Sequence, residues 1–161
     1  MSRRLTYLYK QLSRNMHSRD LGGLGEAILR EHLELQGYAV AQPDENHSGD
    51  WWVCTPDKPD HELKVEVKTA KRGEKSNKWD FRLRKNDKHG VTSIDDSDIV
   101  CFLQINRVSI DLYVVPADFF PKKQKMFSMR STAQFYKGKL KPFYQSIRNI
   151  NLTKNYQPCE V

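Results

Sequence analysis

Apolar side chains recur with a helical period in the first part of this chain and with a strand period after it. An amphipathic helix is predicted over residues 2–17, because apolar residues recur there at helical spacing. These residues are Leu5, Leu8, Leu12 and Met16. A second helix is predicted over residues 18–36, with Ser18 as its N-cap and Gly37 as its stop. Glycines at 22, 23 and 25 lower helix stability, so we expect them to permit close approach of another backbone.

After residue 37, several segments either alternate between apolar and polar residues or are continuously apolar, and these patterns predict strands. In residues 63–69, Val65 and Val67 point one way while Lys64, Glu66 and Lys68 point the other. Further strands are predicted over residues 38–42, 49–53, 79–84, 99–105 and 110–115. The last two are apolar enough to be covered on both faces of a sheet. Together these elements predict one α/β domain over residues 1–161, with a mixed central β-sheet flanked by helices.

The strands at 49–53 and 63–69 are joined by a turn rich in Pro and Asp, which predicts a hairpin. If the chain reverses near Asp57 or Lys58, Asp50 returns opposite Val65 or Glu66. Asp50, Glu66 and Lys68 would then converge at one edge of the sheet, facing solvent. A shift of one residue in the register would turn Asp50 to the other face.

Two carboxylates and an ammonium group in this arrangement could form a metal site. Carboxylate oxygens are hard ligands that select Mg²⁺ or a similar ion, and Mg²⁺ takes only one or two of them. Lys68 could then orient the attacking water or stabilise charge on a phosphate. The alternative is that Lys64, Glu66 and Lys68 are a solvated ladder on an exposed strand.

Several short motifs occur in a characteristic order. The predicted second helix contains Gly22-Gly23-Leu24-Gly25-Glu26, then come Gly37-Tyr38, Asp50, and Glu66-Val67-Lys68. This series resembles the PD-(D/E)XK nuclease superfamily, especially archaeal Holliday-junction resolvases and group I intron-associated endonucleases. The resemblance covers roughly residues 20–117. One departure is that Gly49 stands where the family motif has proline.

The resemblance implies a restriction-endonuclease-like core over about residues 18–120 and Mg²⁺-dependent hydrolysis of DNA phosphodiester bonds. It implies that Asp50 and Glu66 hold one or two Mg²⁺ ions, for which Mn²⁺ can substitute, with the Val67 carbonyl as a further ligand. Glu26 would be the outer member of the site, although it could equally be an exposed helix acid. Lys68 would position the water, and the products would be a 5′-phosphate and a 3′-hydroxyl. Cutting both strands of a duplex or branched DNA would favour a homo-oligomer.

Charge is distributed unevenly along the chain. The net charge is +7, yet residues 1–18 contain four basic residues and no acid, and residues 119–161 contain nine basic residues and only Glu160. Basic segments beside an acidic middle favour a nucleic-acid partner. Phosphate contacts are predicted around residues 71–84, although an ordinary polar strand face would look the same. The predicted contacts are Lys71, Arg72, Lys75, Lys78, Arg82 and Arg84.

The segment 121–161 mixes basic and aromatic residues. It could stack bases while following phosphates, or form a helix whose aromatics cover the sheet. The acids at 95–98 are interpreted as a loop before a strand rather than a second metal site. Cys54 and Cys101 fall within strands and are interpreted as core residues, and neither the cysteines nor the histidines have zinc-ligand spacing.

No apolar run reaches the length of a membrane span, and no secretory signal follows the first residues. A cytoplasmic protein is therefore expected, associated with the nucleoid in a bacterium or archaeon. The first hypothesis is a junction-resolvase-like, homing or restriction-like endonuclease acting on DNA. A second is a non-catalytic nucleic-acid-binding module that uses the basic terminal segments. A nuclease directed at RNA is a third.

Overall fold

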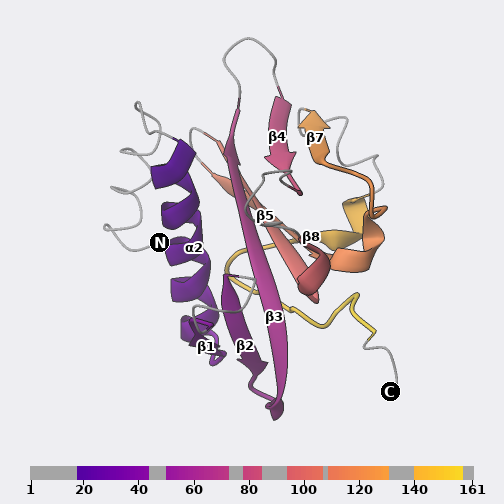
Figure 1. The fold of residues 1–161 in the computed structure, drawn as a ribbon. Helices are drawn as coiled ribbons and strands as arrows, with labels where there is room; N and C mark the ends of the chain where they lie inside the picture. Colours follow the sequence, from indigo (N-terminus) through magenta and orange to yellow (C-terminus); the bar gives the residue numbers. More distant parts are fainter. Residues whose placement is uncertain are drawn as a thin grey trace.

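The computed structural model describes residues 18–43, 50–72, 78–84, 94–106, 109–130 and 140–157. These residues form an α/β fold with a mixed central sheet, as predicted (Figure 1). The six strands of the sheet follow the order β1-β2-β3-β5-β6-β8, in which only β3 and β5 are parallel. Their bounds are β1 Ala39–Ala41, β2 Trp51–Thr55, β3 Lys58–Lys71, β5 Ile99–Ile105, β6 Ile110–Pro116 and β8 Tyr144–Gln145. The helix predicted over residues 2–17 lies outside the described residues.

Helix α2 (Ser18–Leu35) agrees with the predicted second helix. Its apolar stripe, which includes Ile28, Leu29 and Leu33, is buried against the sheet. The helix ends at Leu35, and Gly37 just beyond it has a φ of 86°, the left-handed conformation that glycine adopts without strain. The amide of Tyr38 then donates to the carbonyl of Leu33, which closes the last turn. No helix among the described residues is long and apolar enough to cross a membrane.

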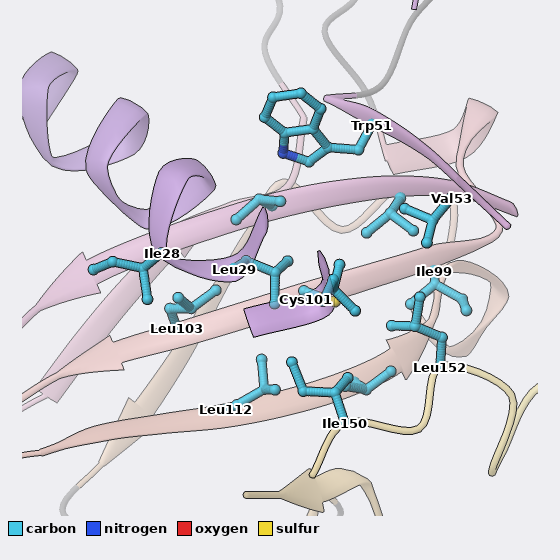
Figure 2. Close-up of a cluster of buried hydrophobic side chains, with 14 of the residues drawn as sticks. Ile28, Leu29, Trp51, Val53, Ile99, Cys101, Leu103, Leu112, Ile150 and Leu152 are labelled. Atoms are coloured by element: carbon cyan, nitrogen blue, oxygen red, sulfur yellow. The ribbon is translucent and has the colours of Figure 1, made fainter. Parts of the chain in front are cut away.

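The hairpin between β2 and β3 has the predicted turn. Thr55 pairs with Lys58 across Pro56 and Asp57, and the register shifts between Cys54 and Thr55. Beyond this shift the pairing is regular as far as Trp51 opposite Val65. The alternation of β3 then places Val65 and Val67 in the core beneath α2, with Val53, Ile99 and Cys101 around them (Figure 2). Glu66 and Lys68 therefore project from the opposite face.

That opposite face is covered by a two-stranded antiparallel ribbon rather than by a helix. We call β4 (Lys78–Arg82) and β7 (Met126–Arg130) together the β4–β7 ribbon. The ribbon and α2 lie on opposite sides of the sheet (Figure 1). Trp79, Phe81 and Met129 are buried in the second core cluster, where the ring centroid of Phe81 lies 4.9 Å from that of Phe102. The prediction of flanking helices therefore holds for one face of the described structure.

The aromatic residues after position 121 pack against the sheet, but from strands and turns. Phe127, Phe143 and Tyr144 lie against the second core cluster, and Tyr144 stacks near Tyr113 with ring centroids 5.3 Å apart. Short 3-10 turns complete this layer at Ile94–Asp96 (η1), Ala117–Phe119 (η2) and Lys141–Phe143 (η3). The covering role of these aromatics is confirmed, while the helix expected to carry them is not found in the described part of the segment.

Candidate active site

The register of the β2–β3 hairpin brings Asp50 beside Glu66. The amide of Asp50 donates to the carbonyl of Val65 at 3.2 Å, so one further step of the register places Asp50 opposite Glu66. The Oδ2 atom of Asp50 accepts a hydrogen bond from the amide of Val67 at 2.7 Å. This bond fixes the carboxylate at the point where β2 begins. The predicted convergence of the two acids is therefore present.

Glu66 and Lys68 form an ion pair on the same face of β3. The Lys68 ammonium donates to Oε1 of Glu66. Lys68 and Asp50 are half-buried, whereas Glu66 is only 8% exposed. The prediction that all three groups face open solvent is wrong, because Glu66 is buried and Asp50 and Lys68 are partly covered. The site is therefore recessed.

Glu26 is brought to the same place by an unusually close contact between α2 and β3. A Cβ atom added to Gly25 would lie 1.7 Å from Oγ1 of Thr69. Only glycine allows the helix to approach this near, so Gly25 permits a close approach as expected, although its neighbour is the side chain of Thr69 rather than the expected backbone. Among the residues that the structure describes, no atom lies within 4 Å of a Cβ added at Gly22 or Gly23, so the close approach expected there is not found.

The electrostatics show that the four charged groups act on one another. Burial, together with the charges of Asp50 and Glu66, raises the pKa of Glu26 to about 7 against the opposing effect of Lys68. Burial also raises the pKa of Asp50, opposed by the hydrogen bond from Val67 and by Lys68. The pKa of Glu66 is raised first by burial, and Asp50 adds to the effect while Lys68 opposes it. Three acids thus crowd around a single ammonium group.

This donor set suits a hard divalent cation. Among the described residues, no three His, Cys, Asp or Glu side chains converge closely enough to hold a metal by themselves. Mg²⁺ does not require three, because it usually takes one or two carboxylates and completes its shell with water and phosphate oxygens. Asp50 and Glu66 are adjacent, and burial is the first cause of the raised pKa of each, so a bound cation would favour the ionised form of both carboxylates. The residues therefore fit a Mg²⁺ ion.

The Val67 carbonyl fits the same donor set. The N–H and C=O groups of one strand residue point to the same side. Because the Val67 N–H points toward Asp50, the Val67 carbonyl points to the same side of the strand.

The predicted phosphate contacts divide into several groups. Lys71, Arg72 and Arg82 are exposed, Lys78 is half-buried, and Lys75 lies outside the described residues. The prediction that Arg84 contacts phosphate is wrong, because its guanidinium is buried and binds groups of the protein itself. Its Nε donates to the carboxylate of Asp95, and Nη1 donates to the carbonyls of residues 121 and 124 at 2.8 and 2.6 Å. The strand ends at Arg82, so the alternation that placed Arg84 on the outer face no longer applies.

The acids before β5 have structural partners, as the loop interpretation expected. Asp95 pairs with Arg84. Asp98 accepts from the amide of Lys64 at 2.8 Å and from the hydroxyl of Tyr156 at 3.1 Å.

Thr69 is a residue of the site that was not predicted, and its contact with Gly25 sets how closely the helix of Glu26 approaches β3. A glycine inside a predicted helix indicates a close contact, but it does not indicate which residue makes that contact.

No protein-family model and no curated protein sequence matches the chain. Among solved structures, the chain is similar to a bacterial homing endonuclease, I-Ssp6803I, with a TM-score of 0.60 and 17% sequence identity. The similarity covers 80% of this chain and 89% of that one. At this level of identity the likeness concerns the fold, and the chain thus shares its fold with an endonuclease.

Proposed function

We propose that this chain is a Mg²⁺-dependent endonuclease that hydrolyses DNA phosphodiester bonds. The observation that carries the proposal is the position of the Asp50 carboxylate, held by the Val67 amide next to the Glu66–Lys68 ion pair. The fold shared with a homing endonuclease supports it. The uneven charge of the chain, with basic segments before and after the site, also favours a phosphodiester substrate.

The residues of the site have separate roles in this proposal. Asp50 and Glu66 would hold the ion, together with the Val67 carbonyl. A bound Mg²⁺ would neutralise charge on the phosphate and make a water molecule more acidic. The Asp50 carboxylate is oriented before any ligand arrives, because the Val67 amide already binds it. The Lys68 ammonium can donate to the attacking water or to a phosphate oxygen, while its pairing with Glu66 restricts its position.

Glu26 would form the outer edge of the site. Its pKa of about 7 lets the carboxyl group hold a proton near neutral pH in the metal-free protein. In-line attack by water would leave a 5′-phosphate and a 3′-hydroxyl. Each chain offers one such cluster among its described residues, so cutting both strands of a duplex would require two chains. A homo-oligomer therefore belongs to the proposal.

A cleavage assay with three DNA substrates tests this function. Purified protein is incubated with a four-way junction, a linear duplex and a single strand, in Mg²⁺ or in EDTA. We expect cleavage of branched or duplex DNA in Mg²⁺, restored by Mn²⁺ after chelation and absent in EDTA. A non-catalytic module predicts salt-sensitive binding without cleavage under every condition. Cleavage that continues in EDTA would contradict the metal dependence, and an RNA strand added to the set tests the RNA alternative.

A further inference from the structure

The β4–β7 ribbon has an inner face that belongs to the core and an outer face that is exposed. Alternation places Trp79, Phe81 and Met129 inside, where they are buried. The outer positions on β4 are Lys78, Asp80 and Arg82, and those on β7 are Met126 and Ser128. Apart from half-buried Lys78, these outer side chains are exposed. The ribbon therefore presents three charged residues of β4, with Ser128 and the apolar Met126 beside them, on a buried base.

Exposed cations precede both strands of the ribbon. Lys71 is the last residue of β3, and Arg72 follows it on the way to β4; both are exposed. Lys122, Lys123 and Lys125 are exposed in the turn before β7. That turn is tied to the end of β4, because the amide of Leu83 donates to the carbonyl of Lys125 at 2.9 Å. A surface with this charge complements the DNA backbone.

One acid, Asp80, lies at the centre of the ribbon. Its Oδ1 accepts from the hydroxyl of Ser128, the residue directly opposite on β7, and lies 3.9 Å from the Lys78 ammonium. A carboxylate repels phosphate, so it weakens a surface that only binds the backbone. A carboxylate can, however, accept a hydrogen bond from the exposed amino group of cytosine in the major groove. Its fixed position is what such readout requires.

We propose that the outer face of the β4–β7 ribbon lies in the major groove of duplex DNA, where Asp80 and Arg82 contact base edges. This inference rests on the proposed DNA substrate and specifies how it is recognised. Asp80 would select cytosine, and Arg82 would select guanine through its O6 and N7 atoms. The lysines and Arg72 around the ribbon would contact phosphates and set its orientation.

The dimensions agree with this placement. The major groove is about 12 Å wide and admits a two-stranded ribbon. Side chains two apart on a strand are separated by about 6.6 Å. Base pairs two steps apart along B-DNA are separated by about 6.8 Å. Asp80 and Arg82 would thus read positions two base pairs apart.

The ribbon also lies on the same face of the sheet as the candidate active site. Lys68 is paired in register with Phe102 on β5, and the ring of Phe102 packs against Phe81 of β4. Arg82 follows Phe81 directly. The ribbon and the side chains of Glu66 and Lys68 thus lie on the same side of the sheet, so a duplex held on the outer face of the ribbon lies on that side of the molecule as well.

Selection of binding sites from a randomised duplex library tests the proposal without cleavage. The protein carries Lys68→Ala so that bound DNA stays intact, and the selected sequences are compared with those obtained after adding Asp80→Asn or Arg82→Ala. Glu62→Gln is the matched control, because it removes another exposed carboxylate, from the hairpin end of β3. Thermal melting verifies that each variant is folded. The best duplex and its single-base variants are then measured at several salt concentrations.

We expect Asp80→Asn to reduce discrimination at one C·G position by about tenfold, and Arg82→Ala to do the same two base pairs away. Glu62→Gln should leave the preference unchanged. An unchanged preference in both ribbon variants would overturn the proposal. So would an Arg82→Ala variant that weakens binding to all sequences equally and lowers the salt slope by about one, which is the signature of a phosphate contact. Binding without any sequence preference refutes the ribbon proposal alone, whereas failure to bind any DNA refutes the proposed function as well.

Discussion

Replacement of Gly25 by alanine tests the contact that places Glu26 at the candidate active site. The added Cβ would meet Oγ1 of Thr69 at 1.7 Å and the Thr69 Cβ at 2.8 Å. Rotation of the threonine side chain relieves the first clash but cannot move its Cβ. The helix and β3 must therefore separate, and Glu26 moves with the helix.

The size of the effect follows from two opposing contributions. Overpacking a close contact costs about 1–3 kcal/mol, sometimes more. Alanine is better than glycine in a helix interior by about 1 kcal/mol. Gly25→Ala should consequently lower the free energy of unfolding by up to about 2 kcal/mol. At Gly23, which is exposed and has no atom within 4 Å of its added Cβ, the same substitution should raise it by about 0.5–1 kcal/mol.

Urea unfolding followed by tryptophan fluorescence measures both values. Thr69→Gly removes all three threonine atoms that the new Cβ would meet, so Gly25→Ala should no longer destabilise in that background. DNA cleavage by the single variant should fall because Glu26 is displaced from the two other acids. A Gly25→Ala protein as stable as Gly23→Ala would refute the close contact between α2 and β3.

Three further substitutions and one chemical modification have defined outcomes. The pKa of Glu26 is raised to about 7 in the folded protein, so ionisation of this carboxyl group at pH 8 opposes folding. Glu26→Gln should therefore stabilise the metal-free protein at pH 8, by about 1 kcal/mol after allowance for solvent screening. The gain should fade toward pH 5, where Glu26 is protonated in the native state, and urea unfolding in EDTA measures both conditions. Burial raises the pKa of the Cys101 thiol to about 12, so iodoacetamide at pH 8 should label it only in denaturant, as peptide mass spectrometry would show. Arg84→Ala should cost about 2–3 kcal/mol of stability through lost charged hydrogen bonds, whereas Arg82→Ala should weaken DNA binding with little change in urea midpoint. Equal midpoints for the two arginine variants would contradict the buried role of Arg84.

The sequence predicted the central part of the site because local rules determine it. Strict alternation fixed the faces of β3, and a turn of proline and aspartate fixed where the chain reverses. They left Asp50 opposite either Val65 or Glu66, and the register shift between Cys54 and Thr55, which was not predicted, places it opposite Glu66. Helix α2 was predicted for similar reasons, since its apolar stripe and the glycine at its end are local signals.

The second layer was not predicted because it depends on pairing between distant segments. Strand β4 pairs with β7, so that Asp80 lies opposite Ser128, 48 residues along the chain. No local pattern in either strand indicates the other. The burial of Arg84 was not predicted for the same reason, because it depends on Asp95 and on the turn before β7 rather than on the strand of Arg84 itself. An alternating segment indicates an exposed face only while the strand continues.

The central claim is that Lys68 acts in hydrolysis as part of a site with Asp50 and Glu66. Lys64 provides a matched control, because it is a lysine on the same face of the same strand, exposed and four residues away. The most direct measurement is the single-turnover rate of DNA cleavage in Mg²⁺ by the unmodified protein, Lys64→Ala and Lys68→Ala. We predict that Lys64→Ala cleaves at close to the unmodified rate, and that Lys68→Ala binds DNA but does not cleave it. Equal cleavage by both variants would contradict the assignment of this site.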